Sequence, residues 1–310
     1  MKALFLLNPA AGHGRSVKRW QDIIARLRAG HKDTEVWHTR AQGDGAALTK
    51  RGLEQGFEAV IGVGGDGTIG EVVHGYLASP RELQTRACVG TWPAGSGCDT
   101  ARHLGLSVDD GVDRLLAMLA DRDVRRLDAG RVFYTGADGK PGERYFINIA
   151  ALGLAGDVAR RIETTGKRFG GTASYFISSV GALLGARAAK LELTVDGVRQ
   201  SARYHLVTLA NSSSFGGGMR IADGADMQDG LLDMVTVGDV SRWTLLRNLP
   251  KIYRGEHLGT PGVARRTARR VEASSDQDVW LNIDGEALGK LPAVIEVVPG
   301  AVPFLCPKRR

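Results

Sequence analysis

The stretch EAVIGVGGDGTIGEVVHGYL, residues 58–77, decides the fold of this chain. Its first residues, Glu58–Val63, form an apolar run that predicts a buried strand. A glycine-rich turn, Gly64–Thr68, follows at once, and Ile69–Leu77 then predicts a helix. A strand that passes through a short turn into a helix is the repeating unit of α/β folds, so this stretch predicts a parallel sheet.

The same alternation fills residues 1–128. A helix near Trp20 shows apolar residues at Ile23, Ile24 and Leu27, spaced along one face. A further helix is predicted to begin at Ser107 as its N-cap, with acidic residues in its first turn. The βαβα order predicts a doubly wound domain. The other elements expected here are strands at Lys2–Leu7, Glu35–His38 and Ala87–Trp92 and a helix at Ala46–Gln55.

After residue 128 the pattern changes to short strand-like runs. Asp196-Gly197 between two such runs indicates a two-residue hairpin. We therefore expect a second, mainly antiparallel β-sandwich domain over residues 129–299, with the tail, residues 300–310, packing back on the first domain. Helices are expected near 173–189 and 241–253. The strands expected are Arg144–Ala150, Lys190–Val195, Tyr204–Ala210, Leu231–Val237, Arg270–Ala273, Val279–Ile283 and Ala293–Val298.

Length and composition narrow the class of protein. The 310 residues fit two domains of ordinary size, and the net charge of +7 is compatible with phosphate or anionic-surface ligands as well as with plain solubility. No apolar run approaches the roughly 20 residues of a membrane-spanning helix. Cys88, Cys98 and Cys306 lack metal-ligand spacing and predict reduced thiols. A cytoplasmic location follows as the expectation.

Three glycine-rich turns follow strand candidates in the first half: Asn8–Gly14, Gly64–Thr68 and Pro93–Asp99. In a doubly wound sheet such turns lie at the carboxyl ends of the strands, where ligands bind. Glycine lets the backbone approach a phosphate closely, and the following helix offers free N–H groups. One such turn would be explained by tight geometry alone, but three favour a nucleotide site. None carries a P-loop lysine or a dinucleotide-binding fingerprint.

Asp66 is the unusual member of its turn. A carboxylate in a phosphate-binding loop repels the phosphates unless Mg²⁺ or its water shell stands between them. The alternative is that Asp66 caps the helix that follows, which is a common role for aspartate. The residues alone leave both interpretations open.

At this point the chain resembles a known family. Gly64–Thr68 is similar to the GGDGT loop of the diacylglycerol kinase catalytic domain, shared by bacterial lipid kinases and sphingosine-kinase-like enzymes. Asn8–Gly12 resembles the opening NPxxG turn and Pro93–Asp99 the third turn, although Cys98 stands where the family has asparagine. In the second half, Asn211–Asp233 resembles the N…GGG…DGLLD stretch and Asn282–Glu286 the late DGE motif. The blocks span nearly the whole chain in order.

The resemblance implies an ATP- and Mg²⁺-dependent transfer of the γ-phosphoryl group to a lipid hydroxyl. It implies that Asp66 and Asp99, with Glu286, organise the catalytic Mg²⁺, and that Glu286 accepts the proton with Asp284 close by. A second, structural Mg²⁺ would be held by Asp229, with backbone carbonyls of Asp226 and Leu231. The residues implied for the ATP site are Asn8, Pro9, Gly12, Thr39, Gly64, Gly65, Asp66, Gly67, Thr68, Glu71, Gly95 and Ser96.

Each of the later motifs also has a simpler interpretation. Asp284-Gly285-Glu286 alone would indicate a solvated hairpin turn, and Asp229-Gly230 alone an ordinary turn. The basic clusters Arg265–Arg270 and Lys308–Arg310 are compatible with anionic lipid headgroups or with a solvated strand edge and tail.

The leading hypothesis is a diacylglycerol-kinase-like lipid kinase that makes peripheral contact with an anionic membrane surface at its inner face. The rivals are an NAD-kinase-like small-metabolite kinase and a non-catalytic binding protein that keeps the fold. No nucleic-acid-binding motif is present. The identity of the lipid and the oligomeric state stay open, with a homodimer as one option.

Overall fold

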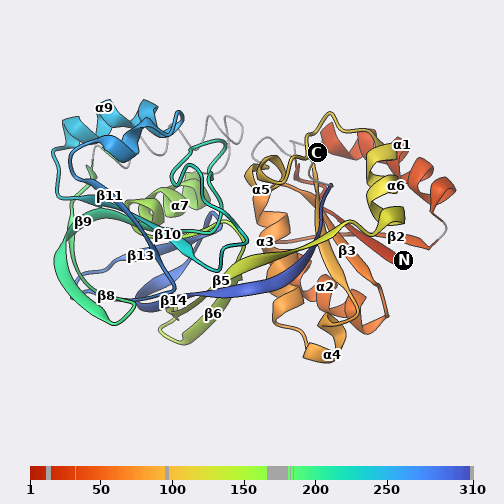
Figure 1. Cartoon of the computed structure of the whole chain (residues 1–310), viewed down its shortest axis with the longest axis horizontal. Helices are drawn as coiled ribbons and strands as arrows, with labels where there is room; N and C mark the ends of the chain where they lie inside the picture. The colour runs from red at the N-terminus through yellow and green to blue at the C-terminus, as the bar shows by residue number, and fades with distance from the viewer. Residues whose placement is uncertain are drawn as a thin grey trace. The chain divides into compact units, whose positions relative to one another are not determined.

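The computed structural model of the chain describes residues 1–11, 15–31, 33–94, 98–165, 181, 183 and 185–307. These divide into two compact units, Met1–Leu127 with Gly300–Arg310, and Asp128–Pro299. Figure 1 shows the elements of both units. Among the described residues, no helix has the length and apolar character needed to cross a membrane.

The first unit is built on a parallel sheet in the order β2-β1-β3-β4-β14. Every residue of β1, β3 and β4 is buried. Because helices cover both faces of a parallel sheet, its strands are apolar throughout, which explains the uninterrupted apolar runs. The strands are β1 (Ala3–Leu7), β2 (Thr34–His38), β3 (Ala59–Gly64), β4 (Cys88–Pro93) and the C-terminal end of β14 (Glu286–Leu305).

Helices flank this sheet on both sides, with α1 and α6 in contact with each other on one side and α2 and α3 on the other (Figure 1). The core between sheet and helices contains Phe5, Trp20 and Leu115, all buried. The helices are α1 (Arg15–Gly30), α2 (Asp44–Glu54), α3 (Asp66–Leu77), α4 (Arg81–Gln84), α5 (Asp99–His103) and α6 (Val112–Asp121).

The strand order reverses between β1 and β3, because the chain leaves β1 toward β2 and then returns to the other edge of β1. At such a switch point the loops that follow the two central strands diverge and leave a crevice at the carboxyl ends of the strands. The loops after β1 and β3 are the first two glycine-rich turns of the sequence. The topology therefore brings them together.

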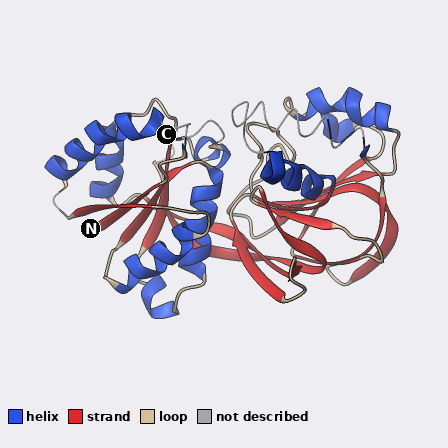
Figure 2. Ribbon diagram, turned by 180° about the vertical axis from the view of Figure 1, so that it is seen from behind, coloured by secondary structure: helices blue, strands red, loops and turns tan. Residues whose placement is uncertain are grey.

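The second unit is antiparallel, and its pairing closes into a ring, β7-β9-β8-β12-β14-β13-β7. The pairs β5–β6 and β10–β11 attach to β14 and β9 (Figure 2). The strands are β5 (Val124–Gly136), β6 (Pro141–Phe146), β7 (Ile149–Gly153), β8 (Ala189–Val195), β9 (Val198–Ala210), β10 (Leu232–Gly238), β11 (Val263–Ala268), β12 (Arg270–Ser274) and β13 (Trp280–Ile283); the helices are α7 (Leu154–Thr165), α9 (Arg242–Ile252) and η2 (Glu256–Gly259).

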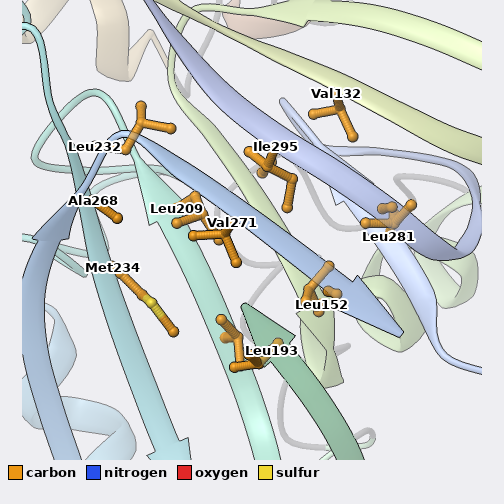
Figure 3. Packing of buried hydrophobic residues seen from close by; sticks show 14 of the residues in the cluster. Val132, Leu152, Leu193, Leu209, Leu232, Met234, Ala268, Val271, Leu281 and Ile295 are labelled. Carbon is orange, nitrogen blue, oxygen red and sulfur yellow. The ribbon is translucent and has the colours of Figure 1, made fainter. Parts of the chain in front are cut away.

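Alternate residues of these strands fill one apolar core, shown in Figure 3. Leu191, Leu193 and Val195 of β8 point into it, while Glu192 between them is exposed. This period-2 pattern is the expected signature of a sheet with one buried face. The doubly wound first domain and the antiparallel β-sandwich second domain predicted from the sequence are both confirmed.

Two local predictions are wrong. The strand expected at Arg144–Ala150 is two strands, β6 and β7, because the N–H groups of residues 147–149 turn toward a carboxylate instead of a neighbouring strand. The helix expected from Ser107 begins at Val112 with Gly111 as its N-cap. Ser107 instead closes a tight turn with Asp110, whose carboxylate accepts the Ser107 N–H at 2.8 Å. The helix expected near 173–189 lies mostly outside the described residues.

Candidate functional site

Asn8 joins the first two glycine-rich turns at the switch point. Its N–H donates to the Val63 carbonyl oxygen at 3.1 Å, and its side-chain amide donates to the Thr68 hydroxyl at 3.2 Å. Its own Oδ1 accepts the N–H of Ala10 at 3.0 Å, which shapes the turn after β1. The structure therefore brings Asn8, Pro9 and Thr68 to one place at the carboxyl ends of β1 and β3.

Asp66 joins the second turn to the third. Its carboxylate accepts the N–H of Asp99 at 3.0 Å, and the N–H and the hydroxyl group of Thr100 at 2.9 Å each. Asp66 thus caps α5, the helix after β4, and not the helix in which it lies. A carboxylate is also the kind of oxygen ligand that Mg²⁺ prefers.

Asp99 and Cys98 lie in the third turn. The Asp99 side chain is buried and forms an ion pair with Arg102, one turn along α5. Cys98 has a left-handed backbone, with φ of +46°, and its Sγ donates to the Gly64 carbonyl oxygen at 3.4 Å. Asparagine adopts the left-handed conformation more readily than other residues with a side chain, so asparagine would suit this position better than cysteine.

The glycines of the second turn differ in what surrounds them. A Cβ added to Gly64 would lie 2.3 Å from the Thr68 hydroxyl oxygen, so packing alone requires glycine there. Among the described residues, a Cβ added to Gly65 or Gly67 would meet nothing within 4 Å. Neither of these two residues has a positive φ, so the protein's own packing does not explain why they are glycine. Open space above a backbone at a helix N-terminus suits a phosphate group.

Glu71, predicted for the ATP site, holds a different element. Its two carboxylate oxygens accept the N–H groups of Gly43 and Gly45, at 2.7 Å each, and the side chain is buried. These N–H groups belong to the start of α2, so Glu71 neutralises the positive end of that helix. Thr39 is also buried, and its N–H donates to the Leu7 carbonyl oxygen at 3.0 Å. Three predicted residues, Gly12, Gly95 and Ser96, lie outside the described part of the chain.

Asp284 of the second unit occupies the turn between β13 and β14. Asp284 and Gly285 both have positive φ, +48° and +94°, as a two-residue hairpin requires. The Asp284 carboxylate is not solvated, because it accepts the N–H groups of Ile147, Asn148 and Ile149, at 2.9 Å each. Burial raises the pKa of Asp284 to about 6, although these amides and Arg144 oppose the shift. Its contacts describe a positioning role, and its catalytic role stays a prediction.

Glu286 is the first residue of β14, directly after this hairpin. Its carboxylate forms an ion pair with the Arg144 guanidinium group at 3.4 Å. Both side chains are largely buried, with 14% of Glu286 and 13% of Arg144 exposed. Arg144 lies on β6 and was not singled out from the sequence, because no spacing rule connects residues 142 positions apart. Tyr134 is near this pair. Burial raises its pKa, with the Arg144 charge lowering it and the Glu286 charge raising it.

The loop from Asp226 to Leu231, predicted to hold a metal, gathers negative charge. The carboxylate of Asp226 accepts the Gln228 N–H at 3.1 Å, and that of Asp229 accepts the Leu231 N–H at 3.0 Å. Burial raises the pKa of Asp229, and the charges of Asp226, Asp233 and Asp128 raise it further. Asp128 also accepts the Gly230 N–H at 2.7 Å.

This concentration of carboxylates suits a cation. Within the described residues, no group of three or more His, Cys, Asp or Glu side chains has metal-binding geometry. A Mg²⁺ ion here would therefore depend on backbone carbonyls and water beside Asp229, as the sequence predicts. Asp128 was not assigned to this acidic loop from the sequence. The only signal was its position, directly before the point where alternating strands and helices give way to short strands.

Two family models match the chain. The model described as the diacylglycerol kinase catalytic domain matches residues 2–132, and the one described as the YegS C-terminal NAD kinase beta sandwich-like domain matches residues 148–306. Among curated proteins, the chain is 31% identical to a diacylglycerol kinase of Mycobacterium tuberculosis, over 99% of this chain and 96% of that protein. It is 28% identical to a diacylglycerol kinase of Staphylococcus saprophyticus, over 94% of this chain and 90% of that protein.

Solved structures show the same fold. A diacylglycerol kinase of Bacillus anthracis matches with a TM-score of 0.75 at 22% identity, over 99% of this chain and 97% of that one. The yeast NADH kinase complexed with NADH matches with a TM-score of 0.55 at 10% identity, over 100% of this chain and 84% of that one. At these identities the likeness concerns the fold alone.

Proposed function

Because this chain belongs to the diacylglycerol kinase family, we propose that it uses ATP and Mg²⁺ to transfer a γ-phosphoryl group to the hydroxyl group of a diacylglycerol-like lipid. Family membership supports a kinase. The nucleotide, the metal and the lipid acceptor are the parts that the proposal adds.

The open space at Gly65 and Gly67 is the observation that carries the nucleotide part of the proposal. Both glycines lie at the N-terminus of α3, and no neighbouring atom of the described residues requires glycine at either position. Absence of a side chain there lets backbone N–H groups approach phosphate oxygens, and the positive end of the helix favours their charge. Thr68 of the same turn, and Asn8 of the neighbouring turn, would border the phosphates.

Asp66 and Asp99 would hold Mg²⁺ and its waters beside the phosphates. When bound, the ion neutralises charge on the phosphoryl group as it is transferred. The donor set fits, since carboxylate oxygens are the ligands that Mg²⁺ prefers. Asp66 is also fixed in place by Asp99 and Thr100, so it would be held ready before the metal binds. Asp229, with the carbonyls of Asp226 and Leu231, would hold the structural ion.

Glu286 would accept the proton of the lipid hydroxyl group as the new P–O bond forms. An alcohol is a poor nucleophile until a base removes its proton. Arg144 orients the Glu286 carboxylate through their ion pair, and Asp284 orders residues 147–149 behind it. In this proposal Asp284 positions the hairpin that carries the base.

The test is a transfer assay with labelled ATP and Mg²⁺, offered diacylglycerol in mixed micelles or NAD, with the product identified by mass spectrometry. We expect label in a phosphorylated lipid. Glu286→Gln should lower kcat by at least about a hundredfold, and Asp66→Asn should do the same. The exposed Asp138→Asn, at a hairpin tip, is the matched control and should keep parental activity.

Label only in NADP would replace the proposal with the small-metabolite kinase, which the shared fold of the yeast NADH kinase also suits. No transfer to any lipid or nucleotide acceptor from the folded parent would favour a non-catalytic member of the family. A Glu286→Gln variant with parental kcat would remove Glu286 as the base while leaving the kinase in place.

A further inference from the structure

The outward face of α9 combines one exposed tryptophan with unpaired basic side chains. Trp243 is 80% exposed, the highest value among the large hydrophobic residues of the described chain. The opposite face of α9 packs inward through Leu245 and Leu249, which are buried with Leu183 and Ala186. Trp243 therefore does not contribute to the core that holds the helix.

Three exposed residues of α9 share one face. Trp243, Arg247 and Pro250 are spaced by four and three residues, and a helix turns about 100° per residue, so they lie along one stripe. Arg242 is exposed beside this stripe, and exposed Arg254 lies in the turn just after the helix. Buried Leu249 lies about 120° from Trp243 around the helix. Figure 1 shows α9 at the outer surface of the second unit.

The charge of this face is not neutralised locally. Between Val240 and Gly255 the chain has four basic residues, Arg242, Arg247, Lys251 and Arg254, and no acidic residue. None of the four forms a salt bridge within the described part of the chain. By contrast, two of the four arginines in the basic cluster Arg265–Arg270 form ion pairs, Arg265 with Asp233 and Arg270 with Glu272 and Glu296. Segment 241–254 thus carries four basic side chains, with Asp239 and Glu256 as the nearest acidic residues on either side in the sequence.

We propose that this face of α9 docks on an anionic phospholipid bilayer, with Trp243 at the headgroup level and the flanking arginines on lipid phosphates. Tryptophan favours the membrane–water boundary because its ring is apolar and its N–H is polar. Basic side chains add attraction to anionic headgroups. One aromatic anchor with a few charges makes binding reversible, which suits an enzyme that visits a surface.

The docking face rests on the proposed function, because it gives a lipid kinase a way to reach its substrate. Binding of the protein to vesicles can nevertheless be measured without ATP. Vesicles of phosphatidylglycerol and phosphatidylcholine, 1:1, are sedimented with the full chain and compared with pure phosphatidylcholine vesicles. We expect sedimentation with the anionic vesicles, weakened by added salt because the charges are exposed. Tryptophan fluorescence should shift to the blue on binding, and this shift should be lost in Trp243→Ala.

Three variants locate the surface. Trp243→Ala should weaken binding by about tenfold, because the apolar anchor is lost. Arg247→Glu with Arg254→Glu should weaken it by about 30-fold or more. The matched control, Arg28→Glu with Arg86→Glu, makes the same charge change at two exposed arginines of the first unit and should bind like the parent.

Vesicle binding of the α9 variants equal to that of the parent would overturn the docking face. A loss of binding in the control variant as large as in the α9 variants would overturn it as well. A Trp243-dependent self-association or single-stranded DNA binding, with no vesicle binding, would replace the lipid surface by another partner. Activity on diacylglycerol in mixed micelles should persist in Trp243→Ala. If the parent transfers phosphate to no lipid but still binds vesicles through α9, the proposed reaction fails and the docking face stands.

Discussion

Asp66 in the first unit and Asp284 in the second each hold a loop in place through their carboxylates. Each carboxylate accepts three hydrogen bonds from a loop that lies far away in the sequence, Asp66 from residues 99–100 and Asp284 from residues 147–149. Hydrogen bonds to an ionised group are stronger than neutral ones, so each aspartate fixes a loop beside a predicted site residue. At the scale of the residue, the same two aspartates that are predicted for the site also hold neighbouring loops in place.

Cys98 is the residue whose substitution should stabilise the protein. Its left-handed backbone disfavours a side chain other than that of asparagine or aspartate. Cys98→Asn should raise the free energy of unfolding by about 0.5–1 kcal/mol and can keep a donor toward the Gly64 carbonyl oxygen. Cys98→Val is the contrasting variant and should lower it by about 1–2 kcal/mol. Urea unfolding measures both, and an unchanged or lower value for Cys98→Asn would contradict the prediction.

Asp284 should make stability depend on pH. Its pKa in the folded state is about 6, above the ordinary value of 3.8, because burial disfavours the charged form. Between these values the folded state binds more protons than the unfolded state, so this group's contribution is greatest below pH 3.8 and is lost as the pH rises through 6. Asp284→Asn cannot titrate. The unfolding free energy of the parent minus that of the variant should therefore fall by about 2 kcal/mol between pH 4 and pH 7.

A difference between parent and Asp284→Asn that stays level from pH 4 to pH 7 would show that Asp284 has an ordinary pKa. The variant should also be less stable than the parent at every pH. An asparagine side chain accepts through one oxygen only, so the Ile147 N–H would face an amide N–H. Urea unfolding at several pH values provides the measurement.

At the scale of the element, glycine serves two different purposes along α3. A Cβ added to Gly75 would lie 2.4 Å from the Ala46 carbonyl oxygen, so Gly75 permits the close crossing of α2 and α3. Gly67, in the first turn of the same helix, has no neighbour within 4 Å of such a Cβ in the described part of the chain. Packing therefore requires glycine at position 75, whereas glycine at position 67 is accounted for by the proposed phosphate site.

The pair Gly75→Ala and Gly67→Ala should separate these purposes. Gly75→Ala should cost about 2 kcal/mol or more of stability, because backbone atoms must move apart. Gly67→Ala should leave stability equal or slightly higher, since alanine favours helix, but should raise the KM for ATP by about tenfold or more. Thermal unfolding and steady-state kinetics on the two variants measure this. A Gly67→Ala variant with parental KM would argue against phosphate at this turn.

Glu71 links α3 to α2, and its removal should loosen α2. Glu71→Ala leaves the N–H groups of Gly43 and Gly45 without their acceptor, which should cost about 2–3 kcal/mol. Glu82→Ala, an exposed glutamate in α4, is the control and should change stability by no more than about 0.5 kcal/mol. Hydrogen exchange over residues 43–54 should speed up in the first variant only. Equal stability losses in the two variants would contradict this role.

At the scale of the whole molecule, the last strand completes the first unit. The C-terminal end of β14 pairs in parallel with β4, at Phe304↔Val89 and Leu305↔Gly90, after the earlier part of the same strand has paired in the second unit. Val302, Phe304, Leu305 and Cys306 are all buried. The first unit therefore needs residues from both ends of the chain.

Phe304→Ala should for this reason destabilise the first unit although it lies near the C-terminus. The expected loss is about 3–5 kcal/mol, because a fully buried aromatic ring is removed. Val124→Ala, at a half-exposed position where β5 begins, should cost about 1 kcal/mol or less. Urea unfolding followed by fluorescence compares them, and a loss below 1 kcal/mol for Phe304→Ala would show that β14 is dispensable there.

Much of this organisation could be predicted because its signals are local. Apolar runs predicted β1, β3 and β4, and Asp196-Gly197 predicted a hairpin that the structure has, with φ of +48° and +85°. The errors occurred where a hydrogen bond to a carboxylate competes with the expected secondary structure. Asp284 divides β6 from β7, and Asp110 draws Ser107 into a turn before α6 can begin.

The sequence by itself determined the order of strands and helices, the glycine-rich turns and the acidic residues that define the family, because these depend on side-chain size, polarity and backbone freedom at neighbouring positions. Only the tertiary structure decided what each acidic residue contacts. Asp66 holds α5, Glu71 holds α2, Asp284 holds residues 147–149 and Glu286 pairs with Arg144. Hydrogen bonds and ion pairs act over a few ångströms in space, and the fold alone sets which distant residues come that close.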